Sequence, residues 1–269
     1  MCFFDYWLKD IDNGVMREPP VKLAIRTGHG AYHFRHENEW PIARTQWTKL
    51  YLDLTTPSAE GNGIAGALAP AKPAALARRS YSASGASHAG HASASSTSLA
   101  ASSGDGLSFV TPPLEQDTEI TGPLAAQLWV SSTTEDMDLF LTLRNIDPDG
   151  NDVLEIGQQG QPVPVAKGWL RVSHRELDPE LSLPYRPYHK HLRRQWLNPN
   201  EIVEVQVEIW PTSMVFRKGH RIRLDIQPRD GIGSAPYTHY HADYNVGENA
   251  IYSGGDKESF LLVPIIPPK

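Results

Sequence analysis

Apolar and polar residues alternate along most of the chain, which is typical of β-strands with one buried face. The clearest case is EIVEVQVEIW (201–210), in which four apolar residues alternate with Glu204, Gln206 and Glu208. A strand with one wet face indicates an antiparallel sheet. The same period occurs in VKLAIR (21–26), KLYLDL (49–54), AQLWVSS (126–132), MDLFLTLRNI (137–146), GWLRVSH (168–174), HRIRLDI (220–226) and SFLLVPII (259–266).

A helical pattern is confined to the start of the chain. Phe3, Phe4, Trp7, Leu8 and Ile11 follow a spacing of three and four residues, and Asn13-Gly14 offers a stop. A helix of nine residues is unstable alone in water, so its aromatic face needs a surface to pack on. Residues 1–20 are therefore expected to be a helix and a linker.

Residues 58–106 break the strand pattern. This stretch is rich in Ala, Ser and Gly, and Tyr81 is its only aromatic residue. So little apolar surface cannot offset the entropy of ordering, which predicts a disordered low-complexity insertion. We expect that deleting it leaves the thermal midpoint nearly unchanged.

Together these patterns predict an all-β fold. About ten strands with no helices between them form a β-sandwich, most simply a jelly roll of galactose-binding-like type. The sandwich would comprise residues 21–57 and 107–269, preceded by the short N-terminal helix and interrupted by the insertion.

Composition narrows the function classes. The 269 residues carry a net charge of −6 and no long basic run, which argues against a nucleic-acid partner. The single cysteine, Cys2, excludes an internal disulfide framework. The start of the chain lacks the pattern of a secretory signal, and FLLVPII is too short to cross a bilayer. These features predict a soluble, cytoplasmic protein without a membrane partner.

No credible serine nucleophile is visible. The nearest approach to G-x-S-x-G is Gly85-Ala86-Ser87-His88-Ala89, which ends in alanine and lies in the low-complexity stretch. A nucleophile elbow needs a strand before it and a helix after it. We therefore expect no catalytic residue in this chain.

Histidine pairs raise the question of a metal. His189/His191 and His239/His241 each share a face if extended, so each pair could chelate. The region around His239 and His241 approaches a cupin pattern, but no histidine follows His241. Ordinary hydrogen bonding is the simpler interpretation, and we predict neither metal nor cofactor, with His239 and His241 as weak candidates.

Exposed aromatic residues could bind a ligand. Trp196, Tyr237 and Tyr240 are weak candidates for the floor of a sugar or peptide site. Packing between the loops of the sandwich is the competing interpretation, because aromatic side chains fill cores more often than they bind ligands.

Several stretches, taken in order, resemble the C-terminal part of the cocaine-esterase / X-Pro dipeptidyl-peptidase family of serine hydrolases. They include FFDYWLKDIDNGVMREPPVKLAI, ENEWPIARTQWTKLYL, TPPLEQDTEITGPLAAQLWVSSTTEDMDLFLTLRNIDPDG, GWLRVSHRELDPE, EIVEVQVEIWPTSMVFRKGHRIRLDIQPRD and YNVGENAIYSGG. The resemblance runs from Phe3 to about Pro264, apart from 58–106.

The resemblance implies two domains with different roles. In that family an α/β-hydrolase domain carries a Ser-His-Asp triad, and a jelly-roll domain follows it. Residues 3–11 resemble the helix that leads out of the hydrolase domain, so this chain is expected to begin after the last triad member. Phe3, Phe4 and Trp7 would then contact the hydrolase domain.

The family therefore implies a non-catalytic jelly-roll module that caps a hydrolase domain, helps to shape its substrate site and supports a homodimer. The parent enzyme would be a dipeptidyl-peptidase or carboxylesterase, and this chain alone would be inactive. The alternative is a free-standing carbohydrate- or peptide-binding jelly roll.

Overall fold

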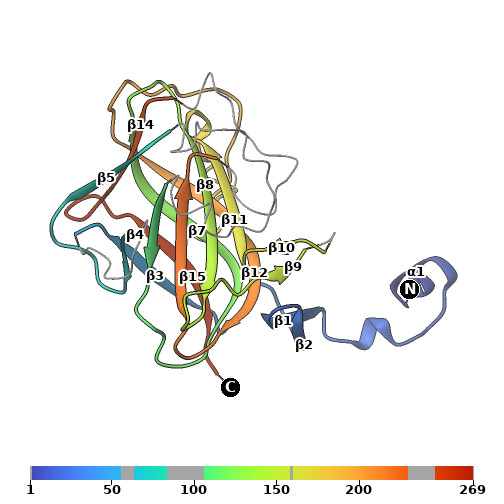
Figure 1. Ribbon diagram of the computed structural model, residues 1–269. Coiled ribbons are helices and arrows are strands. Elements are labelled where there is room, and N and C mark those ends of the chain that lie inside the picture. The colour runs from blue at the N-terminus through green and yellow to red at the C-terminus, as the bar shows by residue number, and fades with distance from the viewer. Residues whose placement is uncertain (1, 56–63, 84–105, 158–159, 230–245, 269) are drawn as a thin grey trace.

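The structure, a computed structural model, describes residues 2–55, 64–83, 106–157, 160–229 and 246–268 (Figure 1). The chain begins with helix α1 (Cys2–Lys9) and has 3-10 turns η1 (Val15–Arg17) and η3 (Val172–His174). The strands are β1 (Val21–Gly28), β2 (Ala31–Glu37), β3 (Gln46–Asp53), β4 (Ile64–Ala69), β5 (Ala77–Ser82), β6 (Leu107–Val110), β7 (Thr118–Ser132), β8 (Asp138–Ile146), β9 (Glu155–Ile156), β10 (Pro162–Val163), β11 (Ala166–Arg171), β12 (Val203–Phe216), β13 (Arg221–Gln227), β14 (Glu248–Ser253) and β15 (Phe260–Ile266).

Most strands belong to one continuous sheet that folds over on itself. Its order is β2-β1-β12-β11-β8-β13-β6-β4-β3-β15-β7-β14-β5, and β12 also pairs with β7. The two long strands β7 and β12 run antiparallel from Val203 opposite Val130 to Phe216 opposite Thr118. This extra pairing connects distant parts of the folded sheet, so the strands surround a single core (Figure 1).

The core is filled by the inward residues of the alternating pattern. Among its fully buried members are Phe109, Leu128, Leu141, Phe216 and Leu224, contributed by β6, β7, β8, β12 and β13. The predicted all-β sandwich with one short N-terminal helix is therefore confirmed. No helix in the described part of the chain has both the length and the apolar character needed to cross a membrane.

One part of the predicted insertion at 58–106 is ordered, and there the prediction of disorder was wrong. β4 lies between β3 and β6, and β5 forms the sheet edge beside β14. Leu68 is fully buried and Tyr81 nearly so. Small side chains suit this place, because a Cβ on Gly66 would lie 2.1 Å from the backbone oxygen of Asp53. Residues 58–63 and 84–105 lie outside the described residues.

A cluster of charged side chains is buried around strand β13. Asp225 on β13 is fully buried and accepts hydrogen bonds from Ser108 Oγ (2.6 Å), Arg144 Nε (2.6 Å) and Arg223 Nε (2.7 Å). Arg144 also pairs with the buried Asp152. Strand alternation therefore identified the polar face of β13, but Asp225 on that face is fully buried.

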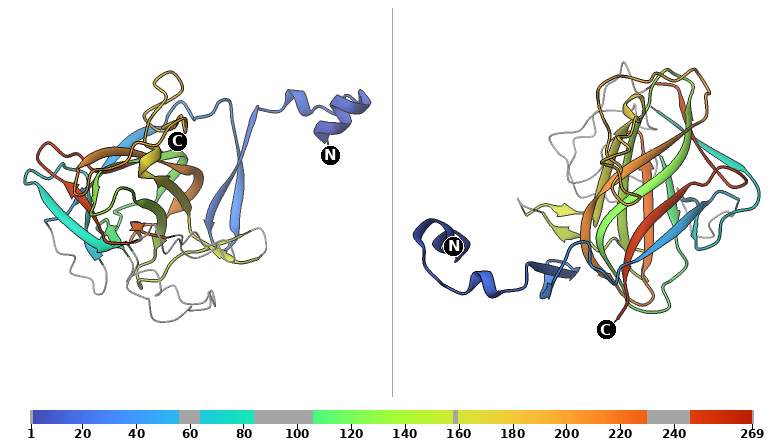
Figure 2. Two further views of the ribbon diagram at one scale, coloured as in Figure 1. Left: turned by 90° about the horizontal axis from the view of Figure 1, so that it is seen from above. Right: turned by 180° about the vertical axis from the view of Figure 1, so that it is seen from behind.

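Helix α1 lies apart from the sandwich. No residue of α1 is buried, and all three ribbon views place the helix beyond the β1–β2 hairpin, connected by residues 10–20 (Figures 1 and 2). Lys9 and Asp5 form an ion pair of 2.7 Å along the helix, and Asn13 Nδ2 donates to Cys2 O. These local contacts hold the helix without burying its aromatic face.

Candidate docking face

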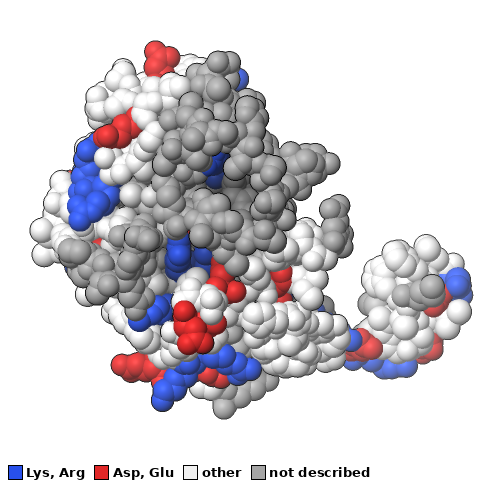
Figure 3. Space-filling model, in the orientation of Figure 1, with Lys and Arg blue, Asp and Glu red and all other residues white. Residues whose placement is uncertain are grey.

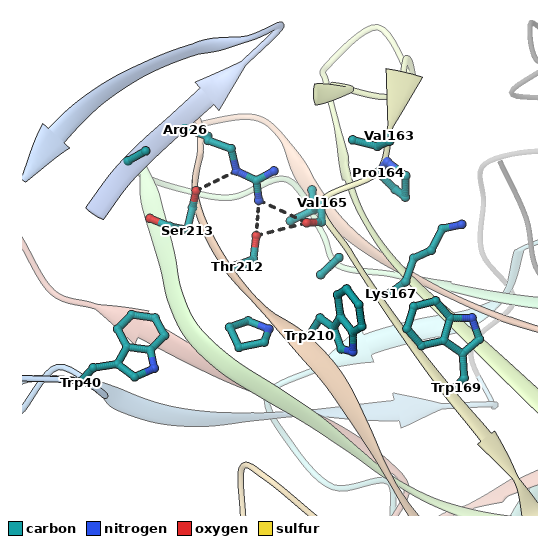
Figure 4. A pocket seen from close by; sticks show the side chains of 13 residues that line it. Arg26, Trp40, Val163, Pro164, Val165, Lys167, Trp169, Trp210, Thr212 and Ser213 are labelled. Atoms are coloured by element: carbon teal, nitrogen blue, oxygen red, sulfur yellow. Dashed lines mark hydrogen bonds between the residues drawn. The ribbon is translucent and has the colours of Figure 1, made fainter. Parts of the chain in front are cut away.

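A hollow of about 720 Å3 lies between the β1–β2 hairpin and the outer face of strands β11 and β12 (Figure 4). Its lining is largely apolar and includes three tryptophans, Trp40, Trp169 and Trp210, together with Arg26 and Lys167. Such a concave apolar surface with a few polar groups is typical of sites that receive a ligand or a partner.

Trp210 lies on the outer face of β12, at the start of a bulge. Ile209 is opposite Leu124 but Thr212 is opposite Gly122, so β12 contains one extra residue. Pro211 within the bulge cannot donate a ladder hydrogen bond, which is why proline is tolerated there. The Trp210 side chain stays 64 % exposed.

Trp169 on β11 stands next to Trp210. Their rings meet edge to face with centroids 5.4 Å apart. Gly168 between Lys167 and Trp169 is opposite Ile209, and a Cβ there would lie 2.3 Å from the backbone oxygen of Glu208. Only glycine therefore allows β11 and β12 to approach closely enough to align the two tryptophans.

Arg26, which lines the hollow, ties the hairpin to the sandwich. Its Nε donates to Ser213 O (3.2 Å), and its Nη2 donates to Val165 O (3.2 Å) and to Thr212 Oγ1 (Figure 4). Burial lowers the pKa of Arg26, and the nearby Glu155 carboxylate partly offsets this. The guanidinium is thus a structural clamp between β1, β12 and the segment before β11.

A second anchor holds strand β2. Arg35 donates through Nη1 and Nη2 to both carboxylate oxygens of Glu119 on β7, at 2.6 and 2.7 Å. Glu37 bridges Arg35 and Arg44. Because both charges are partly buried and the geometry is bidentate, this network orients the hairpin firmly. Two exposed aromatic rings, Tyr32 and Phe34, then stand on β2 with centroids 5.3 Å apart.

Helix α1 carries a further set of exposed aromatic side chains, apart from the hairpin. Phe3, Phe4 and Trp7 are each more than half exposed and touch mainly one another. Figure 3 shows α1 as a separate lobe with few charges on the side in view. We call α1, the rings of Tyr32 and Phe34, and the three tryptophans of the hollow the docking face. A large exposed apolar surface of this kind marks an interaction site.

The other candidates from the sequence fall elsewhere. Trp196 is half exposed and carries Arg194 over its ring at 5.4 Å, but it does not line the hollow. Tyr237, Tyr240, His239 and His241, like the near-elbow at 85–89, lie outside the described residues. Within the described ranges, no group of three His, Cys, Asp or Glu side chains stands at metal-binding spacing.

The sequence analysis did not single out Trp40, Trp210 or Arg26. A signal for Trp210 exists, because the alternation that buries Ile209 places its neighbour on the outer face, where a tryptophan is unexpected. For Trp40 and Arg26 no such signal exists, since they lie far from Trp210 in sequence and line the same hollow only through the tertiary fold.

Comparison with known protein families matches residues 13–262 to the X-Pro dipeptidyl-peptidase C-terminal non-catalytic domain. The chain belongs to this family. A CocE/NonD family hydrolase from Staphylococcus aureus has a similar structure, with a TM-score of 0.81 and 30% identity over 99% of this chain. The α-amino acid ester hydrolase structure, at 17% identity and a TM-score of 0.63, shares the fold.

Curated relatives agree with this assignment. The cocaine esterase of a Rhodococcus species is 24% identical over 98% of this chain, and a putative serine esterase of Mycobacterium bovis is 33% identical over 46% of it. This chain spans 45% of the cocaine esterase and 44% of the S. aureus hydrolase. It is therefore the C-terminal domain type of a serine hydrolase family, and more than half of each of these two relatives lies beyond the match.

Proposed function

We propose that this domain caps the α/β-hydrolase half of a serine esterase or peptidase and helps to shape its substrate entrance. The observation that carries the proposal is the docking face. An aromatic helix without a buried residue stands beside a hairpin anchored by Arg26 and Arg35, next to a hollow lined by tryptophans. An isolated short helix needs a packing partner.

The partner we infer is the hydrolase half, on the same or a separate polypeptide. Matching relatives are more than twice as long as the match and are named hydrolases or esterases. Phe3, Phe4 and Trp7 would pack on that half, and Trp169 and Trp210 would form the centre of the contact, as tryptophans often do in interfaces. The complete enzyme would cleave an ester or amide through an acyl-serine intermediate.

A chimera tests this proposal. This chain replaces the matching portion of the S. aureus CocE/NonD family hydrolase, and hydrolysis of p-nitrophenyl acetate and the unfolding transition are measured. We expect a soluble, active chimera that unfolds in one transition. Trp210→Ala and the double variant Phe3→Ser/Trp7→Ser should each lower activity and split the transition in two, because docking is weakened by about 2 kcal/mol per lost hot-spot side chain.

Trp196→Ala is the matched control, since Trp196 is about half exposed, as Phe3 and Trp7 are, but lies outside the docking face. An inactive parent chimera, or docking-face variants that behave like Trp196→Ala, would contradict the proposal. The 269-residue chain alone should hydrolyse p-nitrophenyl acetate and Gly-Pro-p-nitroanilide only at the background rate. Activity sensitive to a serine-directed inhibitor would show a nucleophile that the proposal denies.

Homodimerisation and a cytoplasmic location belong to the same proposal. The exposed aromatic face favours self-association when the hydrolase half is absent, and a single cysteine suits a reducing compartment. Light scattering coupled to size exclusion, with and without the Phe3→Ser/Trp7→Ser change, measures the oligomeric state.

The second candidate function is a binding module for carbohydrate or peptide, which the three tryptophans of the hollow favour. Sugar rings stack on exposed aromatic faces, and a hollow of about 720 Å3 has room for a short oligosaccharide or peptide. Glycan-array binding that disappears in Trp169→Ala and Trp210→Ala but persists in Trp196→Ala would support it over the capping role.

A further inference from the structure

Three histidines come together away from the docking face. The Nδ1 atoms of His174 and His191 lie 3.2 Å apart, and their ring centroids are 5.3 Å apart. The ring of His189 is next to that of His191, with centroids 5.9 Å apart. His189 and His191 are close in sequence, separated only by Lys190, whereas His174 is brought to them by the fold.

The backbone fixes this arrangement. His174 ends η3, directly after β11, and the segment that follows pairs with the segment carrying the other two histidines. Leu177 and His189 form an antiparallel bridge. The hydrogen bonds between the segments run from Asp178 N to Tyr188 O (2.8 Å), Lys190 N to Glu176 O (2.9 Å) and Gln195 N to Ser173 O (2.7 Å).

His191 adopts a conformation that L-residues rarely take. Its φ is +53°, in the left-handed region, which histidine visits more readily than most residues but which still costs energy. The turn at this residue coincides with the contact between its ring and that of His174. The left-handed turn therefore lies where the two imidazoles meet, with their ring planes tilted by 41°.

The spacing of the two Nδ1 atoms suits a shared metal ion. Zinc binds histidine nitrogen at about 2.0–2.1 Å in a tetrahedron, so two such nitrogens on one ion are about 3.3 Å apart and their ring centroids about 5 Å apart. The observed 3.2 and 5.3 Å are close to both values. Without metal, the same contact is a hydrogen bond in which one Nδ1–H donates to the other Nδ1.

His189 supplies an independent observation. Its Nε2 is buried and has no hydrogen-bond partner, although buried polar atoms are normally paired. No three ligands stand at metal spacing as they are among the described residues, so His189 would complete the set by a rotation of its ring. Glu176 already forms an ion pair with Arg193 at 2.7 Å. This pair also neutralises the positive charge of Arg193 next to the site.

We propose that His174, His191 and His189 form a binding site for a divalent transition metal of the zinc class. Imidazole nitrogens suit such ions, and the fourth position would be held by water. The ion would join the end of β11 to the segment 188–195. This site is independent of the docking face and of the capping role.

Calorimetric titration of the metal-free 269-residue chain with ZnSO4 tests the proposal, together with Co2+ absorption as a reporter of tetrahedral nitrogen ligands. We expect one ion per chain and a rise in the thermal midpoint on adding Zn2+. His174→Gln and His191→Asn should each weaken binding by at least about tenfold. Asparagine is chosen because it also tolerates the left-handed conformation, so that variant keeps the fold.

The control is the double variant His239→Ala/His241→Ala, which removes the other histidine pair of the sequence. It should leave zinc binding unchanged. The proposal is overturned if the chain binds no stoichiometric zinc, if His174→Gln and His191→Asn bind as tightly as the parent, or if the His239/His241 double variant abolishes binding. His189→Ala should lower the affinity and remove the tetrahedral Co2+ spectrum; an unchanged spectrum would reduce the site to a two-histidine chelate and contradict the triad.

Discussion

Replacing Asp225 by alanine should be among the most damaging single changes in this domain. The fully buried carboxylate accepts hydrogen bonds from Ser108, Arg144 and Arg223. Arg144 is itself almost completely buried, and its pKa lies above the ordinary value because Asp225 and Asp152 together outweigh the effect of burial. Two arginines and two aspartates balance, so the cluster as a whole is neutral.

Asp225→Ala leaves two guanidinium groups with one carboxylate inside the sheet. Removing one partner of a buried pair costs about 3–5 kcal/mol, because the remaining charge stays desolvated. With an m-value of about 2–3 kcal/mol per molar urea, the unfolding midpoint should fall by about 1–2.5 M. Urea titration followed by tryptophan fluorescence measures this.

Two further variants separate the causes. Asp225→Asn keeps the volume and removes the charge, so a loss close to that of alanine would assign the cost to charge rather than to a cavity. Asp5→Ala breaks an ion pair on α1, which does not pack on the sandwich, and should leave the midpoint unchanged. A loss below about 1 kcal/mol for Asp225→Ala, or an asparagine variant as stable as the parent, would refute the reasoning.

Four other changes test the fold. Leu68→Ala in β4 should cost about 2–5 kcal/mol of unfolding free energy, and deletion of 64–82 should abolish cooperative unfolding, since these residues complete the core; calorimetry would contradict this if the deleted chain melted like the parent. Gly168→Ala should cost about 1–3 kcal/mol, because its Cβ would meet the Glu208 backbone oxygen at 2.3 Å; an unchanged thermal midpoint would show that β11 can shift. Burial lowers the pKa of His220, so the folded state binds fewer protons than the unfolded state and stability should fall as pH drops through about 6.5. The His220→Gln variant can still hydrogen-bond to Asn145 Oδ1. It should show a smaller loss of stability than the parent between pH 7.5 and 5.5. If the thermal midpoints of variant and parent fall equally steeply with pH, the effect belongs to other groups.

Much of the architecture could be predicted because strand alternation is a local signal. The strands around 201–210 and 220–226 were found from their period alone, and β12 (Val203–Phe216) and β13 (Arg221–Gln227) cover most of these ranges. The helix at 3–11 was found from its aromatic spacing, and α1 covers Cys2–Lys9. Strands β4 and β5 were missed because they contain few large apolar side chains: β4 is mostly alanine and β5 is mostly polar. They are held by neighbours distant in sequence, β3, β6 and β14.

The amino-acid sequence by itself determined the all-β class, the aromatic helix and the lack of a G-x-S-x-G motif, because each depends on the order of residues within short stretches. Tertiary structure alone decided that Asp225 is buried, that Trp40 meets Trp169 and Trp210 around one hollow, and that His174 faces His191. Those contacts join residues whose separation along the chain carries no periodic signal. They exist only because the paired strands place them side by side.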